Sequence, residues 1–597
     1  MSFVILPCWL DDKAQFLPLN NVNIIDEQLS SQGEIRKDYM QIYQIFTRLF
    51  GNQNMTRTPH GTLEENGVGK MNDITTTVLN RIHDMGFTHV WYTGVIRHAS
   101  TTDYTQYGIP RQHPAIVKGK AGSPYAITDY YDIDPDLAED VHSRMDEFEA
   151  LVKRTHEAGM KVIVDFVPNH VARQYHSICK PQGVRDLGEN DDVNKHFDIH
   201  NNFYYCPGYP FKTAIDLCKD ASEPYREYPA KCTGNDCFNA SPSANDWYET
   251  VKLNYGIDYT DAGGRSEHFD PMPDTWRQMT DILLFWASKG VDGFRCDMAE
   301  MVPTAFWQYA IGKLKATYPH VIVVGEVYNP TLYRAYIASG FDYLYDKVGM
   351  YDCLRDIVCG KRPAHHITRQ WQSVDDILPK MLYFLENHDE QRIASDFFCG
   401  SAERALPAFM VCAWLHTNPV MVYAGQEFGE RGMDAEGFSG LDGRTTIFDY
   451  WAVKSIIEGY YQREKMDKRS QRLSEVYQKI LQLCHQPAIA QGQFFDLMYA
   501  NSQHSALFNP DEQYVFLRKS AEQLLLIVVN FSPNQQTVHV NIPEHAFNYL
   551  QMSQGTCKAI DLMTNKEQTV AWQVGRPFVT QVMGYGSKIY EIIRHEV

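Results

Sequence analysis

The sequence predicts an α/β protein built on a (β/α)8 TIM barrel, with an inserted domain after the third strand and a C-terminal antiparallel β-sandwich. Three observations support this prediction. Eight short runs rich in β-branched and aromatic residues alternate with helical stretches, which is typical of βα units in a parallel sheet. A long polar stretch interrupts this alternation after the third run. Beyond about residue 501, helical periodicity gives way to alternating strands separated by Pro, Asn and Gln turns.

The eight runs have the length of strands, and helical stretches lie between them. Eight such units are the number that closes a barrel, whereas an open doubly wound sheet would more often show about five or six strands. A closed barrel is therefore favoured. The predicted strands are residues 42–46, 88–92, 161–166, 291–295, 321–324, 341–345, 381–385 and 419–423.

Several of these strands are entered through a glycine. A helix commonly ends on a residue with a left-handed backbone, which glycine adopts at the lowest cost. We therefore expect a glycine just before a predicted strand to end the helix that precedes it. The four such glycines are Gly86, Gly159, Gly290 and Gly340.

The interruptions divide the chain into four predicted segments. Residues 1–170 form an N-terminal extension and the first part of the barrel, and residues 274–500 form its second part. Between them, residues 171–273 are rich in Asn, Asp, Tyr, Gly and Cys and far exceed the usual βα loop of about 2–6 residues. This stretch is predicted to be an inserted domain. Residues 501–597 are predicted to form the C-terminal β-sandwich.

Composition excludes several classes of partner. The chain has 55 basic and 74 acidic residues, a net charge of −19, and no basic run, so nucleic acid is not expected to bind. No stretch reaches the roughly 18–20 apolar residues of a membrane helix, and residues 1–10 lack the features of a signal peptide. Thirteen scattered cysteines fit reduced thiols, so we expect a cytoplasmic protein. No pattern predicts an oligomeric state.

Five cysteines crowd into one part of the chain. Their spacings match no zinc pattern well, so buried free thiols are the favoured interpretation. A local metal site or a disulfide bridge is the alternative. The five are Cys179, Cys206, Cys218, Cys232 and Cys237.

Polar side chains gather at the ends of four predicted strands. A single polar residue there would usually form a turn or cap the next helix. In a barrel, however, all the carboxyl ends meet at one mouth, and burying several charges together is costly unless chemistry needs them. These residues are Asp165, Asn169 and His170 after the third strand, Arg295 and Asp297 at the fourth, Glu326 after the fifth, and Glu386, His388 and Asp389 after the seventh.

Two of these carboxylates are suited to act as a pair. Alternation along the fourth strand puts Arg295 and Asp297 on the same side, where the cation would keep Asp297 ionised, as a nucleophile requires. Neighbouring strands lie about 4.8 Å apart, so Asp297 and Glu326 can stand about 5 Å apart, which suits a retaining glycosidase. The nearby negative charge would favour the protonated form of Glu326, which could then act as an acid.

These segments resemble the four sequence regions of the α-amylase family of glycoside hydrolases. They are residues 165–170 (DFVPNH), 293–297 (GFRCD), 325–327 (GEV) and 386–389 (ENHD), in that order. Residues 125–129 (YAITD), 251–254 (VKLN) and 425–427 (GQE) add to the resemblance. It extends from residue 42 to about residue 450, and the sandwich tail is also typical of the family.

The resemblance implies a role for each of three carboxylates. Asp297 would attack the anomeric carbon and form a covalent glycosyl intermediate. Glu326 would protonate the leaving oxygen and then activate water or an acceptor sugar. Asp389 would bind hydroxyls of the distorted ring and stabilise an oxocarbenium-like transition state.

It also implies the residues that would bind substrate or orient this machinery. Arg295 would orient the nucleophile, and Asp165 would orient Arg295. His170 and His388 would form hydrogen bonds with hydroxyls of the same sugar. Tyr125 would stack beneath its ring.

Two further positions are compared with the family pattern. Asn169 matches a residue that in many members ligates a structural Ca²⁺ bridging the barrel and the insertion, so calcium is a suggested cofactor. Many amylases carry Lys-His shortly after the nucleophile, where this chain has Glu300 and Met301. Glu300 could recognise a substrate amine or hydroxyl. Alternatively, it is a carboxylate at a helix start, where the helix dipole favours it.

Several functions remain open at this stage. Hydrolysis of α-1,4-linked glucans is the favoured function. An α-glucan transferase, an α-glucosidase or a disaccharide isomerase would use the same residues and would differ in the loops around the acceptor. A non-catalytic sugar-binding relative is disfavoured because all three carboxylates are present. A metal-dependent hydrolase built from His170, His388 and Asp389 is disfavoured because no further ligands complete a catalytic zinc site.

Overall fold

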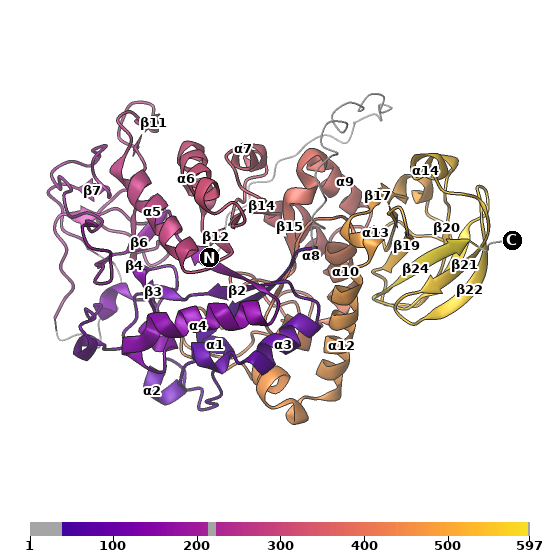
Figure 1. Ribbon diagram of the computed structural model, residues 1–597, viewed down its shortest axis with the longest axis horizontal. Helices are drawn as coiled ribbons and strands as arrows, with labels where there is room; N and C mark the ends of the chain where they lie inside the picture. Colours follow the sequence, from indigo (N-terminus) through magenta and orange to yellow (C-terminus); the bar gives the residue numbers. More distant parts are fainter. Residues whose placement is uncertain (1–38, 213–222, 439, 595–597) are drawn as a thin grey trace. The chain divides into compact units, whose positions relative to one another are not determined.

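The computed structural model describes residues 39–212, 223–438 and 440–594 (Figure 1). Residues 1–10, which lack signal-peptide features, and Cys218 of the cysteine-rich segment lie outside the described residues. Within the described residues, no helix combines the length and apolar character needed to cross a membrane.

Eight parallel strands close into a barrel in the order β1-β16-β15-β14-β13-β12-β5-β2. Every predicted strand is present within a few residues of its expected place, so the predicted barrel is confirmed. The strands are β1 (Gln41–Phe46), β2 (His89–Thr93), β5 (Lys161–Phe166), β12 (Gly293–Cys296), β13 (Ile322–Gly325), β14 (Tyr343–Tyr345), β15 (Met381–Phe384) and β16 (Val420–Tyr423).

The barrel strands are apolar because both of their faces are covered. Every residue of β15 and β16 is buried, as expected for parallel strands that pack against side chains inside the barrel and helices outside it. The principal helices of this part of the chain are α3 (Thr76–Asp84), α4 (Arg144–Glu157), α5 (Asp274–Ser288), α6 (Thr304–Thr317), α7 (Tyr333–Ala338), α8 (Asp352–Val358), α9 (His366–Ser373), α10 (Leu406–Trp414) and α12 (Lys468–Leu483). Shorter helices are α1 (Thr47–Phe50), α2 (Leu63–Asn66), α11 (Lys454–Ile456) and α13 (Pro487–Ala490).

The glycines before the strands have the backbone conformation that the sequence predicts. Gly86 and Gly340 have φ angles of 113° and 115°, and Gly159 and Gly290 have φ angles of 82° and 86°. A residue with a Cβ atom would be strained at such a positive φ angle, whereas glycine is not. Each glycine therefore lets the chain leave a helix and turn directly into the next barrel strand.

The described residues of the long stretch after β5 form short strands of two or three residues. Three antiparallel pairs occur there: β6 (His170–Ala172) with β9 (Thr250–Lys252), β7 (Tyr205–Cys206) with β8 (Ala230–Lys231), and β10 (Ile257–Asp258) with β11 (Ser266–Glu267). A further pair, β3 (Ile96–His98) and β4 (Ile127–Ile133), follows β2. β6 begins the stretch four residues after β5, and its pairing with β9 brings residues 250–252 back to that place. The assignment of residues 171–273 as a separate domain stays a prediction.

The C-terminal part is antiparallel, as expected for a β-sandwich. A six-stranded sheet has the order β17-β18-β19-β24-β21-β22, and β20 pairs with β23 (Figure 1, yellow). β17 already belongs to this sheet, which therefore begins before residue 501. The elements are β17 (Gln493–Asp496), β18 (Gln513–Lys519), β19 (Leu524–Asn530), β20 (Gln536–Val540), α14 (Glu544–Tyr549), β21 (Gly555–Asp561), β22 (Lys566–Trp572), β23 (Phe578–Val582) and β24 (Gly586–Arg594).

Candidate active site

The carboxyl ends of adjacent strands bring the predicted charged residues together. β12 lies between β5 and β13, and Arg295 of β12 stands in register with Asp165 of β5 and Val324 of β13. Asp297 and Glu326 directly follow the paired strands β12 and β13, so they leave the barrel side by side. Parallel strands with matched ends therefore place these side chains at one edge of the barrel.

One guanidinium joins the carboxylates of three strands. Arg295 Nη1 lies 2.8 Å from Asp297 Oδ1 and 3.2 Å from Asp165 Oδ1. Its Nη2 lies 2.7 Å from Glu326 Oε2. All four side chains are more than nine-tenths buried. Asp297 and Glu326 thus converge on the two nitrogens of a single cation.

The electrostatics of Asp297 differ from the sequence-based expectation. Burial raises the pKa of Asp297 well above its ordinary value, and the nearby Glu326 and Asp389 add to this effect, while Arg295 opposes it. Burial also raises the pKa of Asp165. Arg295 serves three carboxylates at once, and burial outweighs its effect on the pKa of Asp297.

Glu326 receives hydrogen bonds on both of its oxygens. Tyr328 donates its hydroxyl to Oε1 at 2.7 Å, and the backbone N–H of Met298 donates to Oε2 at 2.8 Å. Met298 has a φ of 43°, in the left-handed region that non-glycine residues seldom adopt. Burial raises the pKa of Tyr328 well above its ordinary value, so its hydroxyl stays a donor. The sequence analysis missed Tyr328, although its place two residues after Glu326 was a signal.

Glu300 has a role that the sequence analysis did not consider. Its Oε2 accepts hydrogen bonds from the backbone N–H groups of Tyr328 and Asn329, each at 2.9 Å. The carboxylate therefore anchors the segment that follows β13. In that position it holds Tyr328 beside Glu326.

Asp389 is the most solvent-exposed of the three proposed catalytic carboxylates. Its side chain is 38% exposed, and its Oδ2 lies 2.9 Å from His388 Nε2. Burial opposes ionisation, but His388, with help from Arg295 and Arg444, lowers the pKa of Asp389 to about 2. Asp389 is therefore negatively charged at any ordinary pH and has a face open to a ligand.

His388 lies behind Asp389 and is held by the protein. Its Nδ1 is 2.7 Å from Gln44 Nε2, and its Nε2 contacts the Tyr125 hydroxyl in addition to Asp389. The Tyr125 ring lies 5.2 Å from the His388 ring and 5.3 Å from the Arg295 guanidinium, between centres. Both ring nitrogens of His388 thus have protein partners, which suits a positioning role.

His170 is also buried and uncharged. It is 3% exposed, and burial lowers the pKa of His170 to about 3, with Lys252 adding to the effect. Its Nδ1 lies 3.1 Å from Asn169 Nδ2. His170 is therefore a neutral imidazole at neutral pH.

The surroundings of Asn169 do not fit the suggested calcium ion. Asn169 Oδ1, the atom that would ligate the metal, accepts a hydrogen bond from Lys252 Nζ. Asn169 Nδ2 donates to the Gly234 carbonyl at 2.8 Å. A second cation on the same oxygen would meet the positive charge of the ammonium at close range. These contacts argue against a calcium ligand at Asn169, which stays an untested prediction.

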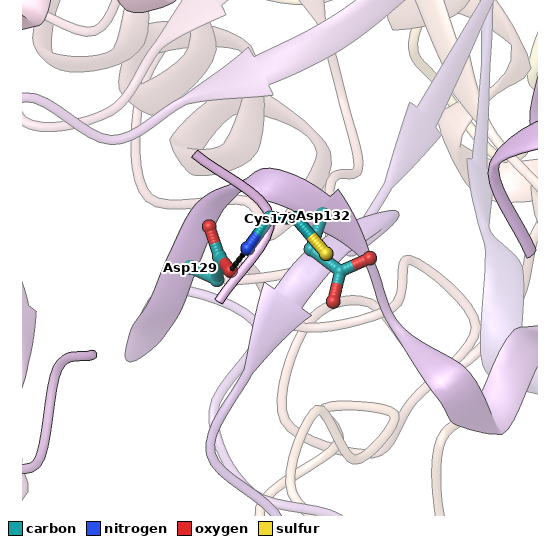
Figure 2. A group of neighbouring side chains, drawn as sticks. All are labelled: Asp129, Asp132 and Cys179. Atoms are coloured by element: carbon teal, nitrogen blue, oxygen red, sulfur yellow. Dashed lines mark hydrogen bonds between the residues drawn. The ribbon is translucent and has the colours of Figure 1, made fainter. Parts of the chain in front are cut away.

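A second group with metal-ligand spacing also has partners of its own. Figure 2 shows Asp129, Asp132 and Cys179, with the Cys179 N–H donating to Asp129 Oδ2 at 3.0 Å. Arg97 lies 3.1 Å from Asp129 Oδ2, and Arg144 lies 2.7 Å from Asp132 Oδ1. Burial raises the pKa of Cys179 to about 11, so it remains a thiol. Two guanidinium groups thus supply the positive charge that a metal would bring.

The described cysteines of the crowded segment form no common metal centre. Cys206 and Cys232 are buried, with sulfurs 3.8 Å apart, and both are free thiols. Cys179 and Cys237 are also free, Cys179 being exposed. Across the described ranges no three cysteines meet at one point. Free thiols, the favoured interpretation, agree with this arrangement, although not all of them are buried.

The fold and the site together define a class of protein. A closed parallel barrel with buried carboxylates around one guanidinium at its C-terminal edge is the architecture of a barrel enzyme. Buried titratable groups of shifted pKa are typical of active sites.

Comparison with known proteins identifies the family. The family model for the α-amylase catalytic domain matches residues 44–482, so this chain belongs to the α-amylase family of glycoside hydrolases. α-Amylase 3 of Dictyoglomus thermophilum is 26% identical over 52% of this chain and 54% of its own length. Neopullulanase 2 of Thermoactinomyces vulgaris is 21% identical over 84% of this chain and 71% of its own length. The chain thus spans about half the length of the first relative and about seven tenths of the length of the second.

Solved structures resemble the whole fold. An α-amylase from Geobacillus thermoleovorans, determined in complex with acarbose, aligns with a TM-score of 0.61 at 18% identity. The alignment covers 93% of this chain and 99% of the other. The barrel and the C-terminal sheet therefore both have counterparts in that fold.

Proposed function

We propose that this protein is a retaining α-glycoside hydrolase that acts on α-1,4-linked glucans or maltooligosaccharides. The observation that carries the proposal is the single guanidinium of Arg295, which contacts Asp297 and Glu326 from adjacent strands. Because these two carboxylates lie so near each other, one can attack the anomeric carbon while the other protonates the oxygen of the same glycosidic bond. The names of the relatives, an α-amylase and a neopullulanase, support an α-glucan substrate.

In the first step, the Asp297 carboxylate forms a bond to the anomeric carbon while the bond from that carbon to the glycosidic oxygen breaks. Glu326 gives its proton to the departing oxygen. At the moment of attack Asp297 is ionised and Glu326 carries the proton, as nucleophilic attack and general acid catalysis require. The product is a covalent glycosyl ester of Asp297.

In the second step, water attacks the same carbon from the other face. Glu326, now ionised, takes a proton from the water, and the oxygen of Asp297 leaves as a carboxylate. The resting enzyme is thereby restored. Hydrogen bonds from the Tyr328 hydroxyl and the Met298 N–H hold the Glu326 carboxylate in place in this half of the cycle.

The remaining residues bind and position. Asp389 is ionised and partly exposed, which suits hydrogen bonds to hydroxyls of the distorted sugar ring. His388 holds Asp389, and Asp165 holds Arg295. Tyr125 offers a ring beside this cluster on which a sugar could stack. His170 is the neutral hydrogen-bonding partner proposed for the same sugar.

Incubation with maltoheptaose tests the reaction. Chromatography should show only shorter sugars if water is the acceptor, whereas longer sugars beside them would indicate a glucan transferase. Proton NMR of the early products should show the α anomer, as a retaining mechanism requires. Early β-anomeric products, or the absence of any product from maltoheptaose and maltose, would overturn the proposal.

We also propose that the enzyme works in the cytoplasm. All eleven described cysteines are free, including the neighbouring Cys206 and Cys232. Such thiols fit a reducing compartment. Cell fractionation with antibody detection tests this location, and recovery of the protein in the extracellular fraction would contradict it.

A further inference from the structure

The protein carries an internal cation beside Asn169. Lys252, the last residue of β9, is 2% exposed. Its Nζ contacts Asn169 Oδ1, lies 2.7 Å from Asp236 Oδ1 and lies 3.5 Å from the Met301 carbonyl oxygen. A protonated lysine has three N–H donors and no acceptor. The three oxygens therefore match the three donors of an ammonium group.

These oxygens come from three separate parts of the chain. Asn169 follows β5, Asp236 lies in the turn after β8, and Met301 ends the short helical turn after β12 and Asp297. The backbone N–H of Leu253 also donates to the Asn169 carbonyl at 3.0 Å. One buried charge thus ties the ends of two barrel strands to the long stretch after β5.

Burial lowers the pKa of Lys252, and the carboxylate of Asp236 opposes that shift. The acidic partner is one-third exposed and faces the ammonium directly. A buried ammonium is costly unless such a partner and further hydrogen bonds are present. Asp236 and the two neutral oxygens supply both.

A calcium ion in this place would need the same oxygens. Calcium binds about 6–8 oxygen ligands at about 2.3–2.6 Å, and here the ammonium already contacts the Asn169 oxygen. We propose that Lys252 is the structural cation that links the barrel to the stretch after β5, and that no calcium binds at Asn169. This inference does not depend on the substrate or the reaction.

Metal analysis of the wild-type protein tests whether calcium binds at Asn169. The protein is dialysed against excess CaCl2, desalted and measured by mass spectrometry beside the Asn169→Ala variant. We expect the two proteins to retain the same amount of calcium, whatever they bind elsewhere. One equivalent of calcium that the wild type keeps and Asn169→Ala loses would overturn the proposal.

Thermal unfolding of Lys252→Met tests whether Lys252 is the structural cation that links the barrel to the stretch after β5. Methionine keeps most of the side-chain length but has no charge and no donor, so Asp236 and Asn169 lose their partner. We expect the melting temperature to fall by several degrees, and we expect EDTA to shift the wild type and Asn169→Ala equally. Lys153→Met is the matched control, since Lys153 is 76% exposed and its ion pair with Glu157 contributes little.

Other outcomes would contradict the structural role. The proposal is wrong if Lys252→Met has the same melting temperature as the wild type. It is also wrong if EDTA lowers the melting temperature of the wild type but not that of Asn169→Ala. If Lys252→Met fails to fold, Asp236→Asn replaces it, because this change removes only the counter-charge. A smaller fall in melting temperature is then expected, and no fall would count against the role of Lys252.

Discussion

At the scale of single residues, the site is governed by a shortage of positive charge. Arg295 contacts Asp165, Asp297 and Glu326, and Asp389 lies near enough to raise the pKa of Asp297 further. Burying one cation with several anions destabilises the folded protein and raises the pKa of Asp297. The charges that the proposed reaction needs are therefore also a cost in stability.

Replacement of the proposed nucleophile separates these two effects. Asp297→Asn should lower kcat by about 10⁴-fold or more, because the amide cannot attack the anomeric carbon. It should not lower the melting temperature, because it removes a negative charge from a crowded cluster. Steady-state kinetics and a thermal melt measure the two quantities. Activity near that of the wild type would remove Asp297 from its role.

A second substitution tests the hydrogen bond between Tyr328 and Glu326. Tyr328→Phe removes the hydroxyl that donates to Glu326 Oε1, so the carboxylate loses one of the contacts that orient it. We expect kcat to fall about 10-fold with little change in KM, which steady-state kinetics measure. Arg295, Asp297 and Asp389 are unchanged in this variant. A kcat equal to that of the wild type would refute the assignment.

At the scale of elements, short segments after the strands decide where the catalytic groups point. The left-handed turn at Met298 directs an N–H toward Glu326, and Glu300 in the next turn accepts two N–H groups of the segment after β13. Each of these contacts joins residues about 30 positions apart. The ends of β12 and β13 are therefore fastened to each other beyond the barrel itself.

The anchoring role of Glu300 predicts a difference between two variants. Glu300→Ala leaves the N–H groups of Tyr328 and Asn329 without their acceptor, so kcat should fall about 10-fold with little change in KM. Glu300→Gln keeps an acceptor oxygen and should retain most activity. Kinetics on a nitrophenyl maltooligosaccharide measure both. If Glu300 instead bound substrate, both variants would raise KM.

At the scale of the whole molecule, the C-terminal sheet is joined to the barrel part by a buried cation. Arg518 of β18 is fully buried, and its guanidinium donates to the carbonyls of Trp414 at 3.3 Å and of Ile489 and Gly492 at 2.8 Å. Burial lowers the pKa of Arg518 to about 10. Arg518 thus links β18 to the last residue of α10 and to the segment at and after α13.

Arg518→Met should therefore weaken the folded state. Three carbonyls would lose their donor, and the free energy of unfolding should fall by about 2–4 kcal/mol, with relief of the buried charge offsetting part of the loss. Urea denaturation followed by tryptophan fluorescence measures the change. Arg472→Met, at an exposed position of α12, is the control. An unchanged midpoint would show that these hydrogen bonds contribute nothing.

Much of the fold was predictable because it follows from local patterns. The eight barrel strands are apolar runs of strand length, and the glycines before four of them have the left-handed conformation that ends a helix. The gathering of Asp165, Arg295, Asp297 and Glu326 then follows from the rule that parallel strands end at one edge. The contact between Asn169 and Lys252 did not follow, because these residues are 83 positions apart and no periodicity relates them.

By itself, the sequence determined the barrel, the strands that end in charged residues, and the resemblance to the α-amylase family. Only the tertiary structure decided how the charges are shared. Whether Arg295 serves one carboxylate or three, and whether Asn169 faces a metal or Lys252, depends on burial and on distances through space. Alternation of apolar residues carries no information about either quantity, so neither arrangement could be derived from the sequence.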